Sequence, residues 1–226
     1  MESQIRGGTR WKRFAVVMVP SVAATAAIGV GLAQGALAAS FAVSGQEFKV
    51  KAAHLEGTGF AQYGGVDMGY AEIKEGDRVV PRPVAISTFR KATITKMCQS
   101  VVTPNVPVLG KVTLRLEAGP GPEESRKVQA TNLYLDVTEL DADATFTNID
   151  IGMAAKDTDS TVNPKLGKGP AVKDTNINRN GFAQQAESAV LTNVEQKAWA
   201  TTAGTFRLSG LSMGLHRGDG PGVECY

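Results

Sequence analysis

Ala144-Thr145-Phe146-Thr147-Asn148-Ile149-Asp150-Ile151 is the stretch of this sequence that decides the fold class. Its apolar residues fall at the first, third, sixth and eighth positions, so each half alternates as a half-buried strand does. An amphipathic helix would place apolar residues at the first, fourth, fifth and eighth positions instead. The odd step across Thr147-Asn148 moves the apolar side chains to the other face, so a continuous strand needs a bulge or corner there.

Similar eight-residue units begin at five other positions, Val50, Ala92, Val128, Ala189 and Phe206. The unequal distances between them exclude a solenoid with one fixed period. Strands that are apolar on one face, few aromatic residues and many glycines predict an all-β body. We expect an antiparallel sandwich, a partly open barrel or a curved groove.

The remaining chain predicts how the strands are connected. Between Ser40 and Gly65, glycines at 57, 59, 64 and 65 predict two strands joined by tight turns. The segment from Asp67 to Pro83 reads as a polar connector, because Pro81 and Pro83 do not fit an interior strand. Residues 156–181 are rich in Asp, Asn, Lys, Gly and Pro and predict a long, exposed polar loop. A short helical turn is expected at residues 182–187.

The N-terminal segment, residues 1–39, predicts export. Four basic residues precede Phe14, and residues 14–39 then carry no charge and end in the small-residue site Ala36-Leu37-Ala38. This is the pattern of a secretory signal peptide. A helix of 26 residues would also be about 39 Å long, enough to cross a bilayer, so an uncleaved N-terminal anchor helix is the alternative. Either way, we expect residues 40–226 to form one extracytoplasmic domain, secreted or held at the outer face of the cell membrane.

The net charge of the exported part argues against nucleic-acid binding. The whole chain has 24 Lys and Arg and 22 Asp and Glu, and four of these basic residues and one acidic residue lie in the N-terminal segment. The remainder therefore has 20 basic and 21 acidic residues, without the basic surplus of a nucleic-acid binder.

Only two cysteines occur, Cys98 and Cys225, and both lie in the exported part. An oxidising compartment and an even count favour a disulfide between them, which would tether the C-terminus to the strand at residues 92–99. Two unpaired thiols are the alternative.

One catalytic motif is present. Gly210-Leu211-Ser212-Met213-Gly214 fits the Gly-x-Ser-x-Gly nucleophile elbow of ester hydrolases, which makes Ser212 a weak candidate nucleophile. That motif requires a following helix and a later Asp or Glu and then His, whereas His216 here precedes Asp219 in a Gly- and Pro-rich tail. Strand and turn chemistry explains the glycines more simply, and a catalytic role for the other histidine, His54, would need a different triad geometry.

No cofactor or metal site is expected. The four acidic residues at 136, 139, 141 and 143 fit a solvated hairpin end better than a calcium loop, because EF-hand spacing is missing. The two histidines and two cysteines have no zinc-ligand spacing, and no phosphate-binding loop is present.

Three hypotheses for function remain. The first is a noncatalytic envelope protein that binds a lipid or another hydrophobic molecule between sheet and loop. The second is a structural surface protein that assembles through exposed strand edges. The third is a secreted ester hydrolase that uses Ser212.

Several stretches together resemble an uncharacterised family of exported proteins from filamentous high-GC Gram-positive bacteria. The resemblance covers nearly the whole chain and is carried by the N-terminal apolar run, Met97–Val101, Ala200–Phe206 with Leu208 and Gly210-Leu211, and Glu224-Cys225. Members often have the automatic label "cholesterol esterase", but the resemblance transfers no catalytic residue. It implies a membrane partner, a small multi-pass protein that tends to be found with the family.

Overall fold

The computed structural model describes residues 43–44, 46–70, 79–173 and 176–226, which belong to the compact unit Phe41–Tyr226. The predicted signal or anchor segment lies outside the described residues. Within them the structure is built from strands and two short 3₁₀ turns: β1 (Val43–Ser44), β2 (Phe48–Tyr70), β3 (Val79–Thr95), β4 (Met97–Val106), β5 (Gly110–Ala118), η1 (Glu124–Arg126), β6 (Val128–Thr147), β7 (Asp150–Ala154), η2 (Ala155–Thr158), β8 (Phe182–Thr202), β9 (Thr205–Arg207) and β10 (Ser212–Arg217). The all-β prediction is confirmed. No helix in this part of the chain has the length and apolar character needed to cross a membrane.

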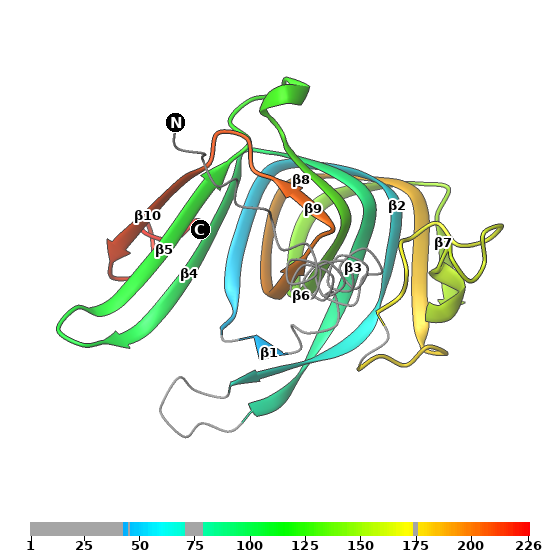
Figure 1. Cartoon of the computed structure of the whole chain (residues 1–226), viewed down its shortest axis with the longest axis horizontal. Helices are drawn as coiled ribbons and strands as arrows, with labels where there is room; N and C mark the ends of the chain where they lie inside the picture. Colours follow the sequence, from blue (N-terminus) through cyan, green and yellow to red (C-terminus); the bar gives the residue numbers. More distant parts are fainter. Residues whose placement is uncertain (1–42, 45, 71–78, 174–175) are drawn as a thin grey trace, which may run out of the picture. The chain divides into compact units, whose positions relative to one another are not determined.

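Four long strands, β2, β3, β6 and β8, form a small closed barrel. Each pairs antiparallel with two others of the set, in the circular order β2–β3–β6–β8–β2. The strands coil strongly around the enclosed space (Figure 1). Of the three expected architectures the barrel is the closest, but its ring of strands is closed rather than partly open.

The corner predicted at the middle of each eight-residue unit is made by a left-handed residue. In five of the six units the fifth residue has a positive φ: Lys96 (51°), Asn132 (46°), Asn148 (52°), Asn193 (54°) and Gly210 (64°). Asparagine and glycine adopt this conformation most readily. The Thr-Asn step in the sequence is therefore the local cause of the face switch.

The corner lets one strand keep apolar side chains in the barrel on both sides of the step. Ala130 and Leu133 are three residues apart on β6, yet their exposed fractions are 3% and 0%. Ile94 and Met97 flank Lys96 in the same way, and both are buried. A strand with strict alternation would have placed one member of each pair on the outside.

Two of the units do not keep both halves in the core. The unit that begins at Ala144 turns at Asn148 from β6 into β7, and its last residue, Ile151, is 65% exposed. The unit that begins at Phe206 turns at Gly210, and Met213 at its end is also 65% exposed. The expectation that every unit is half-buried was therefore wrong for the second halves of the units that begin at Ala144 and Phe206.

Three local predictions were also wrong. The glycines at 57–65 lie inside one strand, β2, because the long barrel strand bends there instead of ending; at Gly57 a Cβ atom would collide with the ring of Phe89. Pro81 and Pro83 belong to β3 and pair with β2. The pairing of β3 with β6 begins only at Ala85, so the other side of β3 is an edge at the two prolines, where a missing N–H group is tolerated. Residues 182–187 begin β8 rather than a helical turn, because they pair with β2 and β7.

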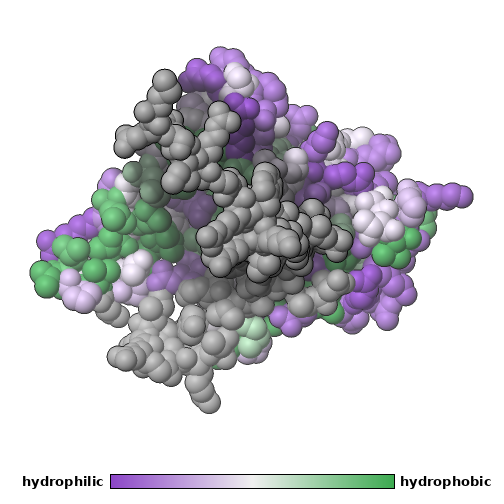
Figure 2. All heavy atoms as spheres, in the orientation of Figure 1, coloured by the Kyte–Doolittle hydropathy of each residue, from purple (hydrophilic) through white to green (hydrophobic). Residues whose placement is uncertain are grey.

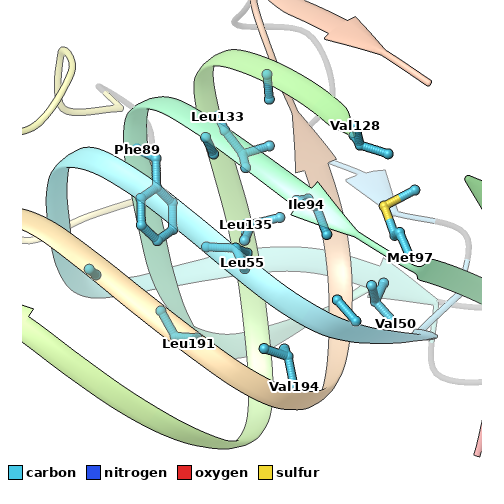
Figure 3. Close-up of a cluster of buried hydrophobic side chains, with 14 of the residues drawn as sticks. Val50, Leu55, Phe89, Ile94, Met97, Val128, Leu133, Leu135, Leu191 and Val194 are labelled. Carbon is cyan, nitrogen blue, oxygen red and sulfur yellow. The ribbon is translucent and has the colours of Figure 1, made fainter. Parts of the chain in front are cut away.

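The main core lies inside the barrel. Figure 3 shows side chains from all four barrel strands pointing into the shared interior, among them Leu55, Phe89, Leu133 and Leu191. A second apolar cluster packs Ala155 and Val172 of the 155–181 segment against other buried residues that include Tyr63. Most described residues of the predicted polar loop at 156–181 are exposed or half-buried, but Thr158 and Asp159 are buried.

Candidate functional site

Three strands outside the barrel, β4, β5 and β10, form a small sheet that we call the wing. β4 continues from β3 and pairs with the start of β2, β5 pairs with β4, and β10 pairs with β5. Successive side chains of a strand point to opposite faces, so the register places two sets of side chains on the two faces of the wing. The two faces differ in chemistry.

One face of the wing is covered by the C-terminal tail. The hydroxyl of Thr113 donates a hydrogen bond to the carbonyl of Gly218 (2.7 Å), and the N–H of Cys225 donates to Ser100 Oγ (3.1 Å). Cys98 and Cys225 lie at disulfide distance, with Cα atoms 5.8 Å apart, and are bonded. The tail is thereby fixed to β4, as the cysteine count led us to expect.

The other face of the wing is apolar and partly open to solvent. Leu116 pairs with Met213 and Leu114 with Leu215 across β5 and β10, and Val101 of β4 lies beside Leu114. Met213 and Leu215 are 65% and 73% exposed. Figure 2 shows hydrophobic residues gathered on the side of the molecule where Figure 1 places these strands.

The β4–β5 hairpin carries this apolar surface to its tip. Val108 there is 98% exposed and Leu109 is 49% exposed. Val108 also has a φ of 70°, an unfavourable conformation for a β-branched residue. A strained, fully exposed valine is not explained by packing, and we regard the tip as part of the candidate surface.

The structure places Ser212 at the start of β10, on the opposite face from Met213, where it pairs with Glu117. The Cα of His216 lies four residues along the same strand, about 13 Å away, with its imidazole against Gly214. Among the described residues no hydrogen bond joins Ser212 to a histidine, although a general base must come within about 3 Å of its nucleophile. The carboxylate of Asp219 accepts a hydrogen bond from Lys111 (2.7 Å), and His54 lies on β2, where its nearest charged neighbour is Glu56 (3.7 Å). Ser212, His216 and Asp219 are therefore not assembled into a triad.

The barrel interior contains a cavity of about 150 Å³. Its wall is mostly apolar and includes Leu55, Phe60 and Leu191. It also includes Leu140 of β6, which is 44% exposed, so the cavity reaches the surface beside that strand. A smaller cavity of about 20 Å³ shares part of this wall.

Three polar side chains face the larger cavity, Gln62, Ser87 and Gln196. Gln62 donates to Ser87 Oγ (2.8 Å) and accepts from Gln184 (2.6 Å), so these groups satisfy one another. Gln196 is 5% exposed and lines both cavities, and its amide has no hydrogen-bond partner among the described residues. The amide atoms of Gln196 are not among the fully buried unpaired side-chain atoms of the described residues, so the amide is accessible from the cavity.

A buried ionic cluster fastens the 155–181 segment to the barrel. Lys173 Nζ donates to both carboxylate oxygens of Asp136 (2.8 and 2.5 Å), and Asp136 is 1% exposed. The N–H of Lys173 donates to the hydroxyl of Tyr63 (3.2 Å). Burial, and secondly the charge of Asp136, raise the pKa of the neighbouring Asp67 to about 6. Burial also raises the pKa of Tyr134, below Lys173, to about 12.

The acidic residues expected at a hairpin end are instead spread along β6 and serve different partners. Asp136 is buried against Lys173, Glu139 pairs with Lys197 (2.7 Å), and Asp143 accepts a hydrogen bond from Asn193 (2.9 Å). No group of three or more potential metal ligands comes together within the part of the chain that the structure describes.

Comparison with protein families gives a match over most of the chain. A family of unknown function (DUF6230) matches residues 44–226, which contain the barrel and the wing. The chain belongs to this family. Neither the curated proteins nor the solved structures include a match. Membership of DUF6230 agrees with the uncharacterised family expected from the sequence and assigns no activity.

Sequence reasoning found the cysteines but missed Gln196 as a possible binding residue. The signal was weak: Gln196 is the eighth residue of the unit that begins at Ala189, a position that is apolar in three of the other five units but is also glutamine in the unit that begins at Ala92. The exposed valine and leucine at the β4–β5 tip had no comparable signal, since the sequence does not say how far a hairpin projects.

Proposed function

We propose that this DUF6230 protein is a noncatalytic, exported protein that docks on the lipid surface of the cell membrane through the apolar face of the wing. The observation that carries the proposal is the exposed apolar set on that face, above all Met213 and Leu215 with the Val108–Leu109 tip. Contiguous apolar surface that is left open to solvent commonly marks a site of interaction with a protein or a membrane.

The chemistry of the face fits a phospholipid surface. The residues that the register places on it include no acidic side chain, and its one charged residue is Arg217, which aligns with Val112 near the hairpin tip. Apolar side chains with a basic residue at their margin suit acyl chains below anionic head groups. The acidic Glu117 and Asp219 are paired with Arg115 and Lys111 instead.

Two further considerations favour lipid over a protein partner. The most exposed apolar residue, Val108, lies at the end of a projecting hairpin, a shape that enters a bilayer interface without a complementary groove. In the sequence, only residues 40–42 separate the predicted signal or anchor segment from β1. If that segment stays in the membrane, it keeps the folded domain next to the bilayer.

Hydrogen–deuterium exchange of the full exported chain tests the proposal, with and without vesicles of phosphatidylcholine and phosphatidylglycerol. We expect vesicles to slow exchange at the β4–β5 tip and in β10. The variant Met213→Asp with Leu215→Asp should lose this protection. The matched control is Ile151→Asp with Phe182→Asp, two residues that are 65% and 66% exposed but lie on β7 and β8; it should keep the protection. Equal protection of the wing in both variants, or none in the unaltered protein, would refute membrane docking.

A second candidate, assembly with further copies of the chain, rests on the outer edge of β10. Among the described residues β10 pairs only with β5, so its other edge has no strand partner. Sedimentation that shows one concentration-independent monomer would remove this candidate. The ester-hydrolase alternative, which uses Ser212, has no assembled triad in its support, and an unchanged rate of ester cleavage in Ser212→Ala would eliminate it.

A further inference from the structure

We infer that the barrel interior is a binding site for a small, neutral, mostly apolar molecule with one hydroxyl or carbonyl group, held by the amide of Gln196. This site is independent of the wing and of membrane docking. It is assigned from the shape and chemistry of the cavity.

The size of the cavity limits the ligand. A volume of about 150 Å³ is close to that of engineered protein cavities that accept one benzene molecule. A whole sterol or phospholipid is several times larger. The ligand that fits inside the barrel is therefore about as large as a single six-membered ring, and the opening beside Leu140 gives it a way in.

The wall of the cavity determines the polarity of the ligand. Among the described residues that line it none is charged, so an ionised ligand would be buried without a partner. Gln62 and Ser87 are bonded to each other, whereas both the donor and the acceptor of the Gln196 amide are unused among the described residues. A hydroxyl or carbonyl group can bond this amide, while the rest of the ligand contacts Leu55, Phe60 and Leu191.

The position of Gln196 in the fold supports a role in binding. It is the last inward-facing position of the unit that begins at Ala189, whose other inward residues (Ala189, Leu191 and Val194) are all buried and apolar. Gln185, at 1% exposed, shows what a structural glutamine on the same strand looks like: its side chain bonds Asp150, Leu166 and Lys168. Gln196 has no such set of partners.

Phenol and toluene test the inference, because they have the same shape and differ in a hydroxyl group. Their affinities for the full exported chain are measured by calorimetry, and the side-chain amide signal of Gln196 is followed by NMR. We expect phenol to shift that signal, and the ratio of phenol to toluene affinity to fall at least about tenfold in Gln196→Leu, as the loss of one hydrogen bond worth about 1.4 kcal/mol predicts. Gln196→Met serves as a second variant of similar shape.

A cavity-filling variant completes the experiment. Ala142→Leu adds three carbon atoms at a partly buried position in the cavity wall and should abolish binding of both probes. The inference is overturned if neither probe binds the unaltered protein. It is equally overturned if the affinity ratio stays the same in both Gln196 variants, or if Ala142→Leu leaves binding unchanged. None of these results bears on vesicle protection of the wing, so the two proposals fail separately.

Discussion

Replacing Lys96 by glycine should stabilise the protein, although glycine in a β-sheet ordinarily has the opposite effect. Lys96 lies between β3 and β4 with a φ of 51°, and it makes the corner that lets Ile94 and Met97 both enter the core. Its side chain is exposed, and its N–H donates to the carbonyl of Gly119 (2.6 Å). Glycine keeps that N–H and adopts a positive φ without steric cost.

The expected gain follows from two opposing contributions. The left-handed conformation costs a residue with a side chain about 1–2 kcal/mol. Glycine loses more backbone entropy on folding, which costs about 0.5–1 kcal/mol. The difference predicts that Lys96→Gly raises the free energy of unfolding by about 0.5–1 kcal/mol. For a domain of this size, that corresponds to an increase in Tm of about 1–4 °C.

The assay is thermal and urea unfolding followed by circular dichroism, with Lys91→Gly as the matched control. Lys91 is also an exposed lysine, but it lies within β3, paired with Thr58 and Thr131, and is not among the residues with positive φ. Lys91→Gly should therefore lower the free energy of unfolding by about 0.5–1 kcal/mol. If Lys96→Gly is as destabilising as Lys91→Gly, the corner does not depend on a left-handed residue and our account of the repeat unit is wrong.

Three other predictions concern the disulfide and the buried ionic cluster. Replacing Cys98 and Cys225 by alanine opens a loop with a sequence separation of 127, which should reduce the free energy of unfolding by up to about 4–5 kcal/mol; an unchanged Tm would show that the bond does not form. Lys173→Met leaves the buried Asp136 without its partner and should lower the free energy of unfolding by about 3–5 kcal/mol. Adding Asp136→Asn to the same chain should restore most of this loss, and additive effects of the two substitutions would contradict the prediction. Burial and the charge of Asp136 raise the pKa of Asp67 to about 6 in the folded protein, so ionisation of Asp67 opposes folding. Tm should therefore fall as the pH rises from about 4 through 6. Asp67→Asn should reduce this fall, and an unaltered pH profile in that variant would exclude Asp67 as its source.

The sequence predicted the local structure of the strands better than the closure of the barrel. The apolar pattern with its odd step identified the strands and placed the corners at Thr-Asn steps, because residues that tolerate a positive φ stand at the fifth position. It could not show that four strands close into a ring. Closure depends on pairing between β2 and β8, whose partners such as Leu55 and Leu191 are far apart in the chain.

The errors have a common physical origin. Glycine and proline were interpreted as strand breakers, whereas in this barrel Gly57 makes room for Phe89 and Pro83 lies on an edge that needs no N–H donor. The polar segment at 156–181 was expected to be exposed throughout because its composition is polar, and part of it is buried. Its buried Asp159 is instead satisfied internally, accepting hydrogen bonds from Thr161 and Val172. Composition reports how polar a segment is, but not whether its polar groups find partners within the protein.

Exposed apolar residues alone do not single out the wing. Ile151 and Phe182 lie on β7 and β8, at the opposite end of the strand order from β10, and are as exposed as Met213. The difference lies in what surrounds them. Met213 aligns with Leu116, and the next aligned set brings Leu215, Leu114 and Val101 together across three strands, so that the exposed side chains form one continuous surface. Ile151 aligns instead with Gln184, and its five-residue strand β7 has β8 as its one strand partner within the described part of the chain. An isolated exposed side chain is ordinary on a protein surface, whereas a multi-strand apolar face with an apolar tip requires an explanation. The variant Ile151→Asp with Phe182→Asp is therefore a fair control, because it replaces two similarly exposed apolar side chains and leaves the apolar face of the wing intact.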